Sequence, residues 1–189
     1  MQPNESHSTS ASRSFLTDVQ TLRERSRRQI EQGAVTETYV GDVSQTIEIL
    51  QDVLATEVVC WLRYTQHSIV ATGLASEGVS KEFAEHAREE QGHAMSVAER
   101  INQLGGAPDF DPARLTGRSA AEYTPGEDLA GMIRENLIAE RIAIDHYREL
   151  IRHFADNDPA TRVMLESILA VEEEHASDML DLLAIHGAH

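Results

Sequence analysis

A pattern of glutamate, tyrosine and histidine occurs twice in the chain, and it limits the possible folds more than any other feature. In each copy a tyrosine stands seven residues after a glutamate, and a Glu-x-x-His motif follows further along. The copies are 83 residues apart at the Glu-Tyr pair and 82 apart at the Glu-x-x-His motif. The residues are Glu57, Tyr64, Glu90 and His93, and then Glu140, Tyr147, Glu172 and His175. The repeat predicts two similar structural units that pack against each other.

Each of these glutamates lies within the apolar seam of a segment with helical periodicity. Apolar residues recur at three- and four-residue spacing in segments near 42–71, 80–104, 124–155 and 158–187. Helix-terminal signals bound the segments, namely Asp42, Gly105-Gly106, Thr124-Pro125-Gly126-Glu127 and Asp158-Pro159. Residues 15–32 predict a further short helix, and no segment shows the alternation of a strand.

The connections between these segments predict an all-α four-helix bundle. The first two helices and the last two are joined by short loops, so each pair should form an antiparallel hairpin. About 20 residues separate the hairpins, enough to run back along a helix of ~38 Å as a long crossover. We therefore expect a bundle over residues 42–189, preceded by a flexible tail and a short helical extension over residues 1–41.

Charge and cysteine content exclude several classes of function. The 16 basic and 32 acidic residues give a net charge of −16, so binding of nucleic acid is not expected. The single cysteine, Cys60, excludes a disulfide framework and a four-cysteine rubredoxin site within the chain. The sequence shows neither a signal-peptide pattern nor a membrane-spanning apolar stretch. We expect a cytoplasmic protein with no membrane contact.

Four carboxylates in one core require a counter-charge. Burial of each unpaired ion costs several kcal/mol, and four would exceed the ~5–15 kcal/mol stability of a typical domain. No lysine lies in the four seams. Two divalent cations would balance four carboxylates, and the mixed oxygen and imidazole ligands suit iron or manganese. The alternative, a merely solvated acidic face, is expected for Glu89, Glu173 and Glu174 but not for the repeated set.

Residues 42–186 resemble the bacterioferritin branch of the ferritin-like superfamily. The resemblance rests on Glu57, on Glu90 and His93 in EEQGH, on Glu140 in AERIAI, on Glu172 and His175 in VEEEH, and on Tyr64 beside them. It implies a ferritin-like bundle whose ferroxidase centre holds two iron ions per subunit, with manganese or zinc as possible substitutes. It also implies oxidation of Fe(II) by dioxygen or hydrogen peroxide and storage of the ferric mineral in a homo-oligomeric cage.

Two departures from the bacterioferritin pattern change these expectations. Gln91 stands where bacterioferritins carry the haem-ligating methionine, so haem is not expected. The chain ends at His189 without the fifth helix of twenty-four-subunit ferritins, so we expect a twelve-subunit, Dps-like cage with contacts from residues 15–40. Two alternatives remain open: a Dps-like stress-protection protein, and a rubrerythrin-like peroxidase that consumes hydrogen peroxide without bulk storage.

Several residues near the repeated set have expected supporting roles. His86 should be a core histidine or a support for the ligands, and Cys60 a small buried residue. Tyr64 and Tyr147 should pack in the core and hydrogen bond to a ligand, with redox activity of Tyr64 as the alternative. Asp178 lies one turn past His175 and is a less favoured candidate to orient its ring. The arginines of the N-terminal segment should serve subunit contact or solvation; they are Arg23, Arg25, Arg27 and Arg28.

Overall fold

The computed structural model describes residues 17–28, 30–71 and 76–187, and all regular structure within them is helical. The helices are α1 (Val19–Arg25), the 3₁₀ helix η1 (Ile30–Gln32), α2 (Val43–Val70), α3 (Ser76–Gln103), α4 (Pro112–Arg118), α5 (Leu129–Phe154) and α6 (Pro159–His186). The expected helix over 15–32 is thus shorter and is followed by a separate 3₁₀ turn. The tail expected at 1–14 lies outside the described residues.

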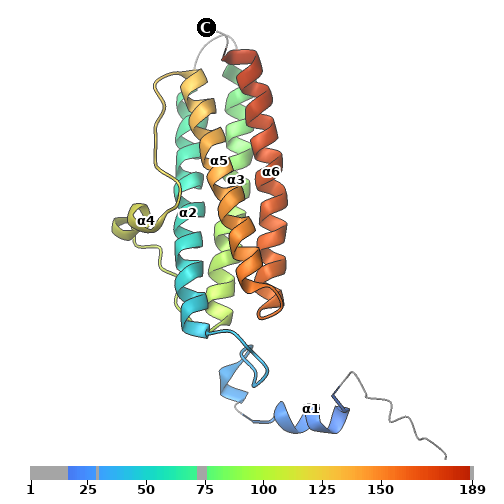
Figure 1. The fold of residues 1–189 in the computed structure, drawn as a ribbon. Helices are drawn as coiled ribbons and strands as arrows, with labels where there is room; N and C mark the ends of the chain where they lie inside the picture. Colours follow the sequence, from blue (N-terminus) through green and yellow to red (C-terminus); the bar gives the residue numbers. More distant parts are fainter. Residues whose placement is uncertain (1–16, 29, 72–75, 188–189) are drawn as a thin grey trace, which may run out of the picture.

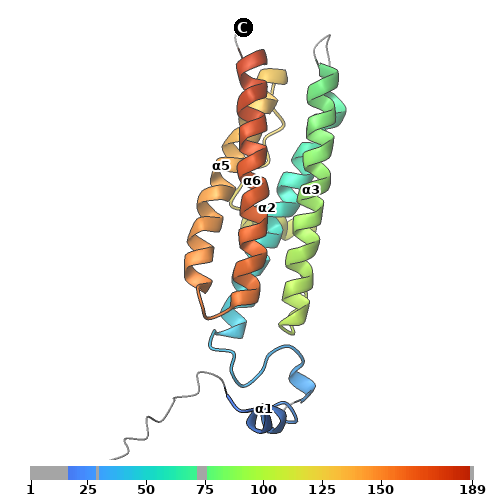
Figure 2. The same ribbon diagram turned by 90° about the vertical axis from the view of Figure 1, so that its right-hand side faces the viewer.

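The four long helices form the predicted bundle (Figure 1). Helix α2 packs against α3 and α5 packs against α6, so each antiparallel hairpin is confirmed. Figure 2 shows the two hairpins side by side along the bundle axis. The caps at Asp42 and Asp158 are also confirmed, because these side chains accept hydrogen bonds from the backbone of Gln45 and Thr161.

The crossover runs along α2 for most of the length of the bundle (Figure 1). It contains the short helix α4, which was not predicted from the sequence. Side chains of α2 hold its backbone by hydrogen bonds at successive levels. The pairs are Gln51 with Ala107 and Asp109, Thr56 with Ala120, Arg63 with Glu122, and His67 with Thr124. These bonds fix the relative placement of the two hairpins.

The start of α5 differs from the prediction. Asp128, not Thr124, caps the helix and accepts a hydrogen bond from the backbone of Gly131. The carbonyl of Thr124 is held by His67 of α2, and Gly126 adopts a positive φ of 70°. Because the backbone at Thr124 is tied to α2 and Gly126 is left-handed, the chain cannot enter the helix before Asp128.

Apolar clusters enclose the middle of the bundle from both ends. One cluster includes Leu50, Leu54 and Ile101, and the other includes Phe83 and Ile133. The repeated glutamates lie between them and are therefore shielded from water. Among the described helices, none combines the length and apolar character needed to cross a membrane.

Candidate metal centre

The structure brings all six predicted ligands to one level of the core. Each of the four long helices contributes one glutamate, and each glutamate is only 1% exposed. His93 and His175 lie on the same helices as Glu90 and Glu172, one turn further along. The i, i+3 spacing places each histidine beside its glutamate on the inner face of the helix.

The donor atoms form two overlapping groups. One group consists of Glu57, Glu90, His93 and Glu172, and the other of Glu90, Glu140, Glu172 and His175. Within each group, the potential ligand atoms lie within 4.8 Å of one another. Glu90 and Glu172 belong to both groups. The arrangement therefore offers two adjacent cation positions with two shared carboxylates.

Several of these buried nitrogen and oxygen atoms lie close together but have no hydrogen-bond partner. Nδ1 of His93 lies 3.0 Å from Glu172 Oε1 and 3.2 Å from Glu57 Oε2. Nδ1 of His175 lies 3.6 Å from Glu90 Oε1. These five atoms have no hydrogen-bond partner within the described parts of the chain. Because buried polar atoms normally have a partner, the set fits a metal pair better than a purely structural network.

Two tyrosines hydrogen bond to the two carboxylates that each belong to only one donor group, Glu57 and Glu140. Tyr64 donates a hydrogen bond to Glu140, and Tyr147 donates one to Glu57. Each bond joins one hairpin to the other, and both tyrosines are buried. The predicted packing and hydrogen bonding of the two tyrosines are confirmed.

The pKa values of several buried groups in this core are strongly shifted. Burial raises the pKa of Glu57 and Glu140 well above the usual value, and nearby carboxylates add to the rise. Burial alone would lower the pKa of His175, but contacts with Glu172 and Glu90 outweigh it and raise the value to about 11. The same kind of contact raises the pKa of His93 against its burial. A bound cation would displace these protons.

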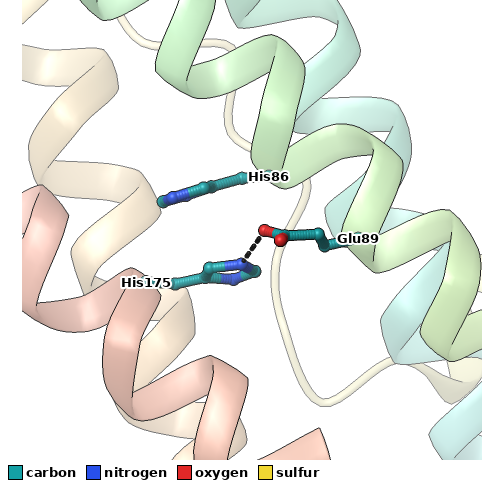
Figure 3. A group of neighbouring side chains, drawn as sticks. All are labelled: His86, Glu89 and His175. Atoms are coloured by element: carbon teal, nitrogen blue, oxygen red, sulfur yellow. Dashed lines mark hydrogen bonds and ion pairs between the residues drawn. The ribbon is translucent and has the colours of Figure 1, made fainter.

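The His175 nitrogen Nε2 contacts Glu89, an acid that the sequence had predicted to be merely solvated. This nitrogen lies 2.8 Å from Glu89 Oε2, an interaction shown in Figure 3. Glu89 is half-exposed, as expected for a solvated acid, but it also orients His175. Asp178 was a less favoured candidate for that role, and its carboxylate faces His86.

His86 is buried against the centre, as predicted. Its ring stacks on that of His175 with centroids 3.9 Å apart and an angle of 19° (Figure 3). Its Nε2 lies 3.4 Å from Asp178 Oδ2 and 3.5 Å from Glu82 Oε1. Burial and the charge of His175 lower the pKa of His86 to about 4.

A buried arginine beside the centre was not anticipated. Arg63 donates hydrogen bonds to the Asn136 side chain and to the Glu122 carbonyl, and its guanidinium lies 5.9 Å from the Tyr64 ring centroid. It also approaches Cys60, which is buried as predicted. Arg63 thus fastens the crossover and α5 to the helix that carries Glu57 and Tyr64.

The fold and this core define a four-helix-bundle protein with a carboxylate–histidine centre. Residues 47–185 match the ferritin-like domain, so the chain belongs to the ferritin-like family. It is 30% identical to the DNA protection during starvation protein of Pyrococcus furiosus over 86% of both chains. It also resembles the nutrient stress-induced DNA-binding protein of a Synechococcus strain, with 30% identity over 75% of this chain and 82% of that one.

Solved structures give the same family. The dodecameric thioferritin of Bacteroides fragilis, a bacterioferritin-related protein, superposes with a TM-score of 0.74 and 33% identity over 77% of this chain and 88% of that one. Dps from Thermosynechococcus elongatus shares the fold, with a TM-score of 0.71 and 20% identity over 74% of this chain and 90% of that one. These relatives support the predicted Dps-like branch of the superfamily.

Proposed function

We propose that the protein is a ferroxidase that binds two Fe(II) ions per chain and oxidises them with dioxygen or hydrogen peroxide. The observation that carries the proposal is the set of four buried carboxylates and two imidazoles whose inward atoms lack partners. The metal pair supplies the redox chemistry. The protein would supply four anionic carboxylates, which stabilise the higher charge of Fe(III) relative to Fe(II) and offset the cost of burying it.

Each residue of the centre has a distinct role in this proposal. Glu57 and His93 would hold one ion and Glu140 and His175 the other, with Glu90 and Glu172 available to both. Tyr64 and Tyr147 hold the carboxylates of Glu140 and Glu57 in position. Glu89 fixes the His175 ring. Manganese or zinc would fit the same donors.

We further propose that twelve chains assemble into a closed cage that retains the ferric product. The Bacteroides fragilis relative is dodecameric. In this chain, apolar side chains of the N-terminal extension are exposed, and closed symmetry would cover them with other copies. The net charge of −16 per chain would favour the approach of Fe(II) to such a shell.

A second candidate function is protection of DNA. It is favoured by the names of the relatives from Pyrococcus furiosus and Synechococcus, which refer to DNA. The acidic charge of this chain opposes direct contact with a phosphate backbone. We propose protection through removal of Fe(II) and peroxide; a gel-shift assay at low salt distinguishes this from binding. A peroxidase without storage remains the other alternative, and iron retained after aerobic loading separates the two.

The proposed centre is tested by comparing Glu90→Ala with Glu174→Gln. Loss of a residue that merely supports a metal ligand costs about 10–100-fold, so loss of the shared Glu90 should slow Fe(II) oxidation at least that much. Glu174 is an exposed acid on α6 and serves as a charge control. Circular dichroism establishes that both variants remain helical. Unchanged oxidation in Glu90→Ala would reject the assignment.

A further inference from the structure

A second cluster of metal-ligating side chains lies at one side of the proposed centre. It consists of Glu82 and His86 on α3 and Asp178 on α6, whose potential ligand atoms lie within 4.8 Å of one another. His86 lies about one helical turn before Glu90, and Asp178 lies about one turn after His175. None of the three belongs to the six ligands of the centre.

The cluster joins a buried imidazole to two solvent-accessible carboxylates. The His86 side chain is 2% exposed, whereas those of Glu82 and Asp178 are 38% and 39% exposed. Nδ1 of His86 has no hydrogen-bond partner in the described structure. Its Nε2 contacts the two carboxylates at 3.4 and 3.5 Å, longer than a good hydrogen bond. His86 is therefore a buried imidazole directed at two partly exposed carboxylates, neither of which forms a close hydrogen bond with it.

The surrounding charges leave the two carboxylates available to a cation. Within the described residues, neither Glu82 nor Asp178 forms an ion pair with lysine or arginine. Glu89 links this cluster to the centre, because the potential ligand atoms of Glu89, His86 and His175 lie within 4.8 Å of one another. Figure 3 shows the Glu89 carboxylate beside the rings of His86 and His175.

The internal repeat shows that this cluster is not a by-product of the symmetry of the bundle. Each of its residues has a counterpart 82 positions away in the other hairpin, and none of the counterparts is a good ligand for a hard divalent cation. Glu82, His86 and Glu89 correspond to Met164, Ile168 and Val171, and Asp178 corresponds to Ser96. On the repeat-related side, Ile168 belongs to the apolar core. The additional cluster is therefore present on only one of the two repeat-related sides of the centre.

We propose that Glu82, His86 and Asp178 bind a divalent cation and deliver it, through Glu89, to the dinuclear centre. The function of this outer site rests on the proposed ferroxidase. One imidazole and two carboxylates suit Fe(II), and they leave coordination positions for water. Binding there should be weaker than at the centre, which has more protein donors. A weak outer site concentrates Fe(II) beside the dinuclear centre and releases it to that centre.

The site is tested by titrating metal-free protein with Co(II) under calorimetry and visible absorption. Wild-type protein should bind two ions tightly and a third more weakly. The double variant Glu82→Gln/Asp178→Asn should lose only the weak third ion, whereas Glu85→Gln/Glu174→Gln should keep all three. Glu85 and Glu174 are exposed acids on the same two helices, so the control removes equal charge.

The outcomes separate this inference from the proposed ferroxidase. A wild-type protein that binds only two ions, or a third ion that persists in Glu82→Gln/Asp178→Asn, would overturn the outer site. Absence of the two tight ions would instead reject the dinuclear centre. In stopped-flow mixing with limiting Fe(II), the double variant should fill the centre several-fold more slowly but to the same final occupancy. An unchanged filling rate would contradict delivery through this site.

Discussion

At the scale of single residues, the centre depends on hydrogen bonds that hold buried carboxylates. Tyr147→Phe removes the donor to Glu57 and leaves a carboxylate oxygen unsatisfied in the core. We expect the free energy of unfolding of the metal-free protein to fall by about 1–3 kcal/mol and metal affinity to decrease. Chemical denaturation and metal titration measure both.

Tyr123→Phe is the matched control for this substitution. Tyr123 hydrogen bonds to Gln66 but is 43% exposed, so loss of its hydroxyl should change stability by less than about 0.5 kcal/mol. Equal effects of the two substitutions would mean that the hydrogen bond to Glu57 has no special role.

The raised pKa values predict how the stability of the metal-free protein changes with pH. The pKa of His175 is about 11 in the folded chain and about 6.5 when unfolded, so its stabilising contribution is complete below pH ~6.5 and is lost as pH rises through 11. The raised pKa values of Glu57 and Glu140 act in the same direction. The melting temperature of the metal-free protein should therefore fall between pH 6.5 and pH 8.5.

Bound metal should oppose this fall, because it replaces protons as the counter-charge. We expect Mn(II) to raise the melting temperature, and to raise it more at pH 8.5 than at pH 6.5. His175→Gln should flatten the pH dependence of the metal-free protein. A melting temperature that rises with pH in metal-free wild type would contradict the charge balance described for the core.

The clustering of the six side chains could be predicted from the sequence because they are repeated and lie in apolar seams. Glu89 was not identified as a partner of His175, because it is half-exposed and its repeat counterpart is Val171. Arg63 was missed for a different reason. Its partners, Asn136 and the Glu122 carbonyl, are distant in sequence and belong to elements that only the tertiary structure brings together.

At the scale of helices, the start of α6 joins three parts of the chain. Asp158 caps α6, forms an ion pair with Arg100 of α3 at 2.8 Å, and accepts a hydrogen bond from Tyr39. Asp158→Ala removes the cap and leaves a largely buried Arg100 unpaired. We expect a loss of about 3–5 kcal/mol in the free energy of unfolding, measured by urea denaturation.

Asp128→Ala provides the comparison, because Asp128 caps α5 at an exposed position. Its loss should cost only about 0.5–2 kcal/mol. If the two substitutions cost the same, the contacts with Arg100 and Tyr39 contribute nothing beyond the cap.

Helix boundaries were predictable where one local signal decides them and not where distant contacts do. Asp42 and Asp158 begin their helices as predicted. The start of α5 was placed too early, because His67 of α2 holds the backbone that precedes it. Helix α4 was missed because it is a short segment packed against α2 through the crossover.

At the scale of the whole molecule, the N-terminal extension leaves apolar side chains uncovered. Leu22 and Ile30 are 47% and 79% exposed, and both line a hollow of about 310 Å³ formed by the extension. The extension lies beyond the end of the bundle at which α2 and α6 begin (Figure 2). We expect these residues to contact neighbouring chains in the cage.

The double variant Leu22→Glu/Ile30→Glu should therefore shift the assembly from a twelve-chain particle to smaller species in mass photometry. Metal stoichiometry per chain should stay the same, because the centre lies within one bundle. Gln20→Glu adds charge on α1 without removing an apolar side chain and should leave the particle intact. A cage that tolerates Leu22→Glu/Ile30→Glu would show that the extension is not an assembly contact.

The central claim is that one chain holds two metal ions among Glu57, Glu90, His93, Glu140, Glu172 and His175. Crystals of wild-type protein loaded anaerobically with Fe(II) test it directly, through anomalous scattering recorded at the iron edge. Two anomalous peaks per chain are expected between the four glutamates, with Glu90 and Glu172 touching both. Iron peaks found only on the protein surface, with none among these six residues, would contradict it.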